Sequence, residues 1–270
     1  MRKLFIFLQV CLYIYAPYLL AGELPTKLLS HAEIESVKQQ LDAQDIYVLT
    51  PDAKGILNDK KKYLIVTFLT KADVENNEKE RSEDKAYAYK CALFSAEHKQ
   101  FRLIAKTPPI EAGGDRTSFN CLIEKQLVVI KIDNWSGGSH QSDTWQFKKI
   151  GSSLSLVGFH EINVSSSTIR DNSYEESIHS VNFSTREAIH SRKSGEKIQQ
   201  WEEGSSSHLP FHVLKPYKYK EASFRFKQYP KMTFKNFSKD RFYKWQQDEK
   251  NMCGWINEEF KFESCKELER

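Results

Sequence analysis

Residues 63–70 read Tyr-Leu-Ile-Val-Thr-Phe-Leu-Thr, and this stretch decides the fold. It is rich in β-branched residues and almost continuously apolar, which indicates a long β-strand. Further strand candidates follow at short intervals, at residues 87–94, 101–104, 127–132, 144–147, 154–159 and 180–183. Short strands separated by turn residues predict a mainly β fold, either an antiparallel meander or sandwich or a partial propeller-like body.

A short helix precedes these strands. Ser30 and Glu33 have the spacing of a capping box, in which each side chain satisfies a backbone N–H group of the other residue. Ile34, Val37 and Leu41 then place apolar side chains at helical spacing, so we expect this helix to pack on the body. The dense charge run at residues 73–85 predicts a solvated loop.

The chain begins with Met1-Arg2-Lys3, and an apolar run follows at residues 4–21. Positive charges ahead of about 15–20 apolar residues are the layout of a secretory signal peptide. Residues 1–21 are therefore expected to direct export to the periplasm. The alternative is that residues 4–21 stay in the inner membrane as an anchor. Export argues against nucleic acid as a partner, and it restricts membrane contact to the case of an uncleaved leader.

Charge and size describe the body that follows the leader. Lys and Arg number 40, Asp and Glu number 36, and two of the basic residues lie in the leader. The remainder is nearly balanced, which argues against a polyanion-binding role for the protein as a whole. About 250 residues remain, enough for one large domain or two small ones with a real core.

The cysteines outside the leader are Cys91, Cys121, Cys253 and Cys265. In an exported chain an even number indicates disulfides, and four cysteines allow three pairings. We favour Cys91–Cys121 together with Cys253–Cys265, because each pair is local and lies within one apparent structural unit. A zinc site is disfavoured, since no Cys-x-x-Cys pair is present.

Composition divides the chain into a leader at 1–21, a helix and lead-in at 22–52, a β domain at 53–200 and a C-terminal unit at 201–270. A linker-like stretch rich in Ser, Gly and Glu marks the last boundary. Beyond it, ten Lys or Arg stand among many aromatic residues up to Trp245. This pattern predicts a small basic and aromatic unit closed by a disulfide. Its simpler interpretation is a hairpin whose buried aromatics alternate with exposed basic residues.

Residues 55–66, Gly-Ile-Leu-Asn-Asp-Lys-Lys-Lys-Tyr-Leu-Ile-Val, resemble a worn repeat opener of FG-GAP/VCBS-like β-propeller proteins. The chain over about residues 53–200 also resembles a group of uncharacterised exported bacterial proteins, in the strand ending Ala92-Leu93-Phe94 and in the segments 101–105, 137–139 and 145–147. The resemblance implies a β scaffold and a bacterial periplasm. In the repeat family the opener is a calcium loop. Here three lysines leave Asn58 and Asp59 as the obvious ligands, so we expect calcium binding to be lost and no cofactor to be used.

No motif indicates catalysis or metal binding. Ser139 and His140 could suggest a nucleophile and a base, but adjacent strand residues point to opposite faces and no Gly-x-Ser-x-Gly elbow is present. His208 and His212 stand four residues apart, but Pro210 disfavours the helix that would bring them to one metal.

Aromatic and basic side chains of the kind that dominate protein interfaces are the better candidates for function. The loop at residues 133–140 groups an aromatic residue, glycines, hydroxyls and a histidine directly after an apolar strand. Together with the basic C-terminal segment it supplies the candidate partner-binding residues Trp135, His140, Trp145, Arg225, Lys227, Arg241 and Trp245.

These expectations favour a non-catalytic periplasmic binding protein. The specific hypothesis is an immunity or inhibitor protein that neutralises a secreted antibacterial toxin, such as a type VI secretion effector, or a cell-wall enzyme by direct binding. The expected partner is a protein, and contact with the cell wall or lipopolysaccharide is a further option. The alternatives are a periplasmic hydrolase whose site is assembled only in the fold, and an envelope polysaccharide-binding or structural module.

Overall fold

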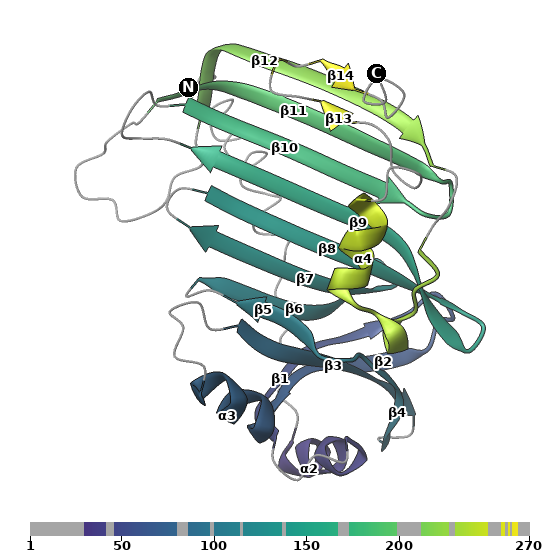
Figure 1. Ribbon diagram of the computed structural model, residues 1–270. Helices are drawn as coiled ribbons and strands as arrows, with labels where there is room; N and C mark the ends of the chain where they lie inside the picture. The colour runs from purple at the N-terminus through teal and green to yellow at the C-terminus, as the bar shows by residue number, and fades with distance from the viewer. Residues whose placement is uncertain are drawn as a thin grey trace, which may run out of the picture.

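A computed structural model gives the fold of the chain (Figure 1). It describes residues 30–41, 46–79, 86–97, 100–113, 116–136, 139–166, 173–198, 212–226, 230–247, 255–256, 259 and 261–263. The leader, the Cys253–Cys265 pair, Lys227 and His208 lie outside these residues, so the expectations that concern them stay predictions.

The described residues form two antiparallel sheets, which confirms the predicted mainly β fold. The first sheet has the order β1-β2-β3-β4, with β5 also paired to β3, and comprises β1 (Ile46–Ile56), β2 (Lys62–Thr70), β3 (Ala86–Glu97), β4 (Gln100–Lys106) and β5 (Ile110–Gly113). The second sheet is a meander in strict chain order and comprises β6 (Thr117–Glu124), β7 (Leu127–Ser136), β8 (Ser139–Ile150), β9 (Ser153–Ser166), β10 (Ser173–Asn182), β11 (Glu187–Ile198) and β12 (His212–Arg225). A short ribbon pairs β13 (Trp255–Ile256) with β14 (Phe262–Glu263).

Strand β2 is apolar throughout because both of its faces are buried. Tyr63 and Ile65 point into the main core between the two sheets, whereas Leu64, Val66 and Phe68 belong to a second cluster on the other face. In a strand with one solvent-exposed face, apolar and polar residues would alternate, and in β2 they do not. Residues 63–70, which predicted a strand from the sequence, therefore lie between the main core and the second cluster.

Helix α2 (His31–Gln40) covers the second cluster with Val37 and Leu41 (Figure 1). Its predicted capping box is present, with the Ser30 backbone N–H donating to the Glu33 carboxylate at 2.8 Å. Gln40 also reaches the edge of the sheet, where its side chain donates to the Phe101 carbonyl and accepts from the Leu103 N–H. The helix thus packs on the body, and it satisfies backbone groups of β4 as well.

The prediction of a loop over residues 73–85 is wrong for its first part, which is helix α3 (Lys71–Lys79). Asp73 starts this helix by accepting the Thr70 N–H at 2.9 Å and the Lys90 ammonium at 2.7 Å. Val74, which belongs to this helix, is buried. Charge density alone suggested solvation, but one buried valine and an anchored first turn are enough to hold a charged helix on the sheet.

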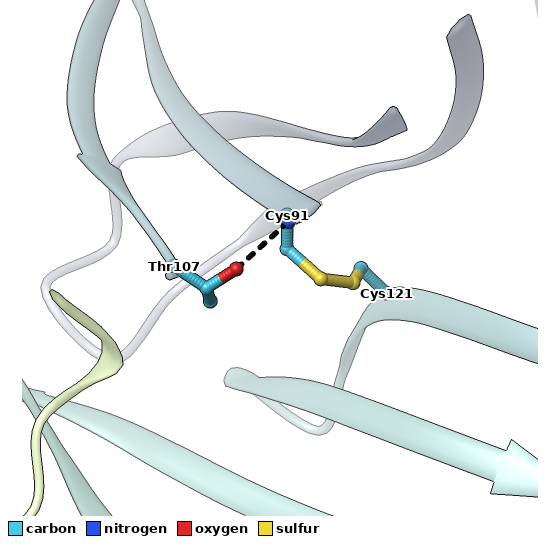
Figure 2. The surroundings of a disulfide bond; sticks show 3 residues. All are labelled: Cys91, Thr107 and Cys121. Atoms are coloured by element: carbon cyan, nitrogen blue, oxygen red, sulfur yellow. Dashed lines mark hydrogen bonds between the residues drawn. A yellow bond between two sulfur atoms is a disulfide. The ribbon is translucent and has the colours of Figure 1, made fainter. Parts of the chain in front are cut away.

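A disulfide joins the two sheets (Figure 2). The predicted Cys91–Cys121 pair is confirmed, with a Cα–Cα distance of 6.2 Å between β3 and β6. Both cysteines are fully buried. Thr107 fixes the cysteine backbone beside the bridge, since its hydroxyl accepts the Cys91 N–H at 3.0 Å and its own N–H donates to the Cys91 carbonyl.

The described part of the C-terminal segment belongs to the main body, so the expected boundary at residue 200 is corrected. Strand β12 pairs along β11, and the 3-10 helix η1 (Phe234–Asn236) and helix α4 (Lys239–Gln247) follow it. Phe234, Phe237 and Phe242 are fully buried in the main core. In Figure 1, α4 lies across the strands of the second sheet. The aromatics of this segment fill the core because that sheet presents an apolar face to them.

Among the helices that the structure describes, none combines the length and the apolar character that a membrane crossing requires.

Candidate functional site

The strand register arranges one face of the second sheet in rows. We call it the inward face, because it carries the core residues Trp145 and Phe159. One row is apolar and contains Ile130, Trp145, Phe159, Val181 and Ala188. The next row, which we call the acid–histidine row, contains Asp143, Glu161, His179 and His190. A third row lies closer to the tip of the β7–β8 hairpin and contains Asn134, Gln141, Asn163, Ser177 and Arg192. The face therefore changes from apolar to polar along the strands.

Helix α4 ends on the acid–histidine row. The Tyr243 hydroxyl donates to Asp143 at 2.6 Å, and the Gln246 amide donates to Nδ1 of His179 at 3.1 Å. Asp143 is only 3% exposed. These contacts satisfy buried polar groups at the point where the apolar contact of α4 with the sheet stops.

Burial shifts the proton affinities along this row. Desolvation raises the pKa of Asp143, and the neighbouring Glu161 charge adds to the effect. Desolvation lowers the pKa of His179 from 6.5 to about 4, with further contributions from His190 and His160. The pKa of His190 is also lowered, first by burial and then by the Arg192 charge. The row therefore holds neutral histidines near neutral pH.

The hydrogen bonds agree with neutral histidines. Nδ1 of His190 accepts the backbone N–H of Ile256 at 2.8 Å, which fastens β13 to β11. Nδ1 of His179 accepts from Gln246, so the proton of each neutral ring is on Nε2. Protonated rings could not accept either bond.

Next to the acid–histidine row, the polar side chains of the third row line a recess of about 400 Å³. Its walls include Asn134, Gln141, Asn163, Ser177 and the Glu175–Arg192 ion pair, and serine hydroxyls from the strand ends complete it. We refer to this cavity as the recess. Most of the described residues that line it have polar side chains, and His140 and Val164 also belong to the lining. Among these residues Glu175 and Arg192 form an ion pair with each other, which suits a neutral, hydrogen-bonding ligand.

The β7–β8 hairpin carries an aromatic pair near its tip, in which Trp135 is exposed and the His140 side chain is only 20% exposed. Trp135 is 55% exposed, and its ring stacks on His140 with centroids 3.8 Å apart. Nε2 of His140 lies 3.3 Å from the nearly buried carboxylate of Asp133. Burial alone would raise the pKa of Asp133, but hydrogen bonds from Ser142 and Lys131 outweigh it and hold the pKa below its usual range. The charged Asp133 side chain thus holds His140, on which the exposed Trp135 ring stacks.

The predicted partner-binding residues do not form one surface. Trp145 is fully buried, so its prediction is wrong: its ring contacts Phe159, Phe237 and Phe242 in the core. Trp245 is partly buried against the same core. These two rings occupy core positions because the inward face carries the apolar row.

The exposed members of the predicted set are far apart in the sheet. Arg225 is 82% exposed beside Glu187, at the start of β11, whereas Trp135 and His140 lie near the end of β7 and the start of β8, at the opposite end of the strands. Arg241 is exposed on α4. Only Trp135 and His140 are in contact with each other.

Sequence reasoning missed the acid–histidine row and the recess. The available signal was polar residues two apart beside the strand candidates at 144–147 and 154–159, as in Gln141-Ser142-Asp143 and Glu161-Ile162-Asn163. Such spacing places two side chains on one face of one strand. It does not say which strands are neighbours or in which register, and these residues come together only through both.

The turn that resembles a calcium loop connects the two sheets. Asp59 accepts the Tyr63 hydroxyl at 2.7 Å and the Lys149 ammonium at 2.5 Å, while Asn58 donates to the Lys149 carbonyl. Burial raises the pKa of Asp59, but the bonds from Lys149 and Tyr63 prevail and lower it to about 2. Within the described residues, no group of three or more His, Cys, Asp and Glu side chains could hold a metal ion.

Comparison with protein-family models, with curated proteins and with solved structures gives no significant match. The resemblance to FG-GAP/VCBS-like repeats therefore stays a prediction.

Proposed function

We propose that this chain is an exported, non-catalytic binding protein that engages a second protein through the Trp135–His140 pair, and that it inhibits a secreted toxin or a cell-wall enzyme. The observation that carries the proposal is the exposed Trp135 ring, stacked on His140 near the tip of the β7–β8 hairpin. Tryptophan is enriched among the few residues that supply most of the binding energy at protein interfaces.

Pre-organisation makes this ring pair a better anchor than a single exposed tryptophan. Stacking limits the rotamers of Trp135, and Asp133 limits those of His140. Binding then loses less side-chain entropy, which is about 0.5–1.5 kcal/mol for each side chain that has to be immobilised. A hairpin within a seven-stranded sheet that is cross-linked to the first sheet also moves little on binding.

The acid–histidine row is the arrangement that a hydrolase would use, since it groups two carboxylates with two histidines. Its burial argues for a binding protein instead. Asp143 is 3% exposed and is covered by Tyr243, and the His179 acceptor is occupied by Gln246. A general acid or base has to reach the substrate within hydrogen-bonding distance, and these groups are committed to holding α4.

The test is affinity capture with the chain lacking residues 1–21, applied to envelope and secreted fractions. We expect one protein to be retained by the unsubstituted chain, lost with Trp135→Ala, and kept with Tyr219→Ala, a control of matched exposure at 54%. The captured protein should then be inhibited by the purified chain at equimolar concentration. Retention that is unchanged by Trp135→Ala, or an uninhibited partner, would rule out the proposal.

A further inference from the structure

We propose that the recess is a binding site for a neutral saccharide. The proposal goes beyond the proposed function, because it assigns a small ligand to the inward face of the sheet, in a recess that adjoins the hairpin tip through His140. It rests on the orientation of two amides, on charge neutrality and on the position of the recess on the sheet.

The carboxylates of Asp143 and Glu161 orient the two amides of the recess. The Gln141 amide nitrogen donates to both oxygens of Asp143, at 3.2 and 3.4 Å, and the Asn163 amide nitrogen donates to Glu161 at 2.9 Å. A carboxylate only accepts, so the nitrogen of each amide has to face it and the carbonyl oxygen is left over. Among the described residues these two carbonyl oxygens have no other hydrogen bond, and both side chains line the recess.

One of these carboxylates is itself held in place. Asp143, to which the Gln141 amide donates, accepts the Tyr243 hydroxyl at 2.6 Å. A site whose contacting groups are fixed by a second layer of hydrogen bonds is pre-organised for its ligand. The two carbonyl oxygens therefore form a fixed pair of acceptors for ligand hydroxyl or N–H groups.

The charges in the recess exclude ionic ligands. Arg192 is paired with Glu175 and also donates to the Ile256 carbonyl at 3.4 Å. An anion would have to displace Glu175, and a cation would be repelled by Arg192. Serine hydroxyls, which both donate and accept, make up much of the remaining wall. A ligand that presents many hydroxyl groups and no charge matches this set.

The position of the recess argues for a saccharide over a peptide. Extended peptides bind by adding a strand to a free sheet edge, where backbone groups are unpaired. The recess lies on the face of β8–β11, whose strands are paired on both sides. Its volume of about 400 Å³ falls within the roughly 300–1,000 Å³ typical of small-ligand sites. Because the described lining has no aromatic ring other than that of His140, we expect weak binding, with a Kd on the order of 1 mM.

The test uses isotope-labelled chain and NMR titration with chitotriose, maltotriose and, for comparison, a neutral alanine tripeptide. We expect at least one trisaccharide to shift the side-chain amide resonances of Gln141 and Asn163 saturably, at concentrations up to about 20 mM. The double variant Gln141→Ala/Asn163→Ala should weaken binding at least roughly tenfold. Asn120→Ala removes a half-buried amide outside the recess and should change nothing.

Each outcome decides the proposal separately from the proposed function. Gln141→Ala/Asn163→Ala should leave capture of the protein partner intact while it weakens saccharide binding. Two results would overturn the saccharide site: no recess resonance moves with either trisaccharide, or the tripeptide shifts the same resonances with equal or higher affinity. The shift map of the unsubstituted chain is sufficient for this decision even where a variant fails to fold.

Discussion

Replacing His179 by phenylalanine should remove the part of the acid-induced loss of stability that this histidine causes. The His179 side chain is 14% exposed and contacts Phe159, Phe224 and His190. Phenylalanine keeps a ring in this space and cannot take up a proton. It also removes the Nε2 group, which is buried without a hydrogen-bond partner among the described residues. That gain offsets the loss of the Gln246 bond, so we expect stability at neutral pH to change by less than about 1 kcal/mol.

The magnitude follows from the shift in the pKa of His179, from 6.5 when unfolded to about 4 when folded. Between these values the unfolded chain binds more protons, so the free energy of unfolding falls as the pH is lowered. The slope is about 1.36 kcal/mol per pH unit for one proton. From about pH 7.5 to about pH 4.5, the His179 contribution therefore amounts to a loss of about 2.5 kcal/mol, which the variant should not show.

Other groups titrate nearby, and comparison of the variant with the unsubstituted chain cancels them. His160 and His190 have lowered pKa values and destabilise the fold in the same direction. The raised pKa of Asp143 acts in the opposite direction, because protonation of the folded state is favoured there. Asp59 loses its stabilising effect only below its unfolded value of 3.8, outside this window.

The assay is urea unfolding followed by tryptophan fluorescence, at a series of pH values between about 4.5 and 7.5. Phe147→Leu is the control, because it loosens a fully buried core site that does not contact His179 and neither adds nor removes a titrating group. Its stability curve should lie parallel to that of the unsubstituted chain, while the curve for His179→Phe should be flatter. If the His179→Phe curve is also parallel, then His179 is not buried in a neutral state and the account of the row is incorrect.

Three substitutions test the core and the junction between the sheets, each by thermal or urea unfolding. Cys91→Ala/Cys121→Ala opens a loop with a sequence separation of 30 and should lower stability by about 3–4 kcal/mol, whereas an unchanged midpoint would mean that the bridge is not formed. Phe242→Ala empties a fully buried site between α4 and the sheet and should cost about 3–5 kcal/mol, and a cost below about 1 kcal/mol would mean that α4 is not docked. Gly55→Ala places a Cβ 2.5 Å from the Ile123 side chain and should cost about 1–3 kcal/mol. Adding Ile123→Ala should then cost less than it does alone, and strict additivity would contradict the close approach of the sheets.

The sequence predicted those features that depend on local spacing. The capping box of α2, the strand over residues 63–70 and the local Cys91–Cys121 pair all follow from residues that are close in the chain or from the parity of the cysteines. Each of these has a short-range physical cause, namely backbone N–H groups to satisfy, apolar periodicity, and loop closure. Such causes can be inferred without knowledge of the topology.

The features that the sequence did not predict depend on which strands are neighbours. Trp145 looked like an interface residue because large aromatics are common both in cores and at interfaces, and alternation does not distinguish the two faces of a strand. Glu161 and His179 belong to the neighbouring strands β9 and β10 and face each other only in the observed register. A shift of one residue would place one of them on the opposite face.

The acid–histidine row contacts both helix α4 and the side chains of the recess, and it therefore links the recess to the helix that covers the core. Asp143 accepts the Tyr243 hydroxyl of α4 with one oxygen, and both of its oxygens receive the Gln141 amide of the recess. On the next strands, His179 accepts from α4 while Glu161 orients Asn163. A sheet face that turns from apolar to polar needs buried acceptors at the border, because the end of the covering helix brings donors there. The same acceptors also orient the side chains of the adjacent solvent-facing row, so no additional polar group has to be buried for this purpose. The acid–histidine row, where the apolar core ends, therefore also pre-organises the recess. This is why we expect a ligand site beside the end of α4 and not elsewhere on this face.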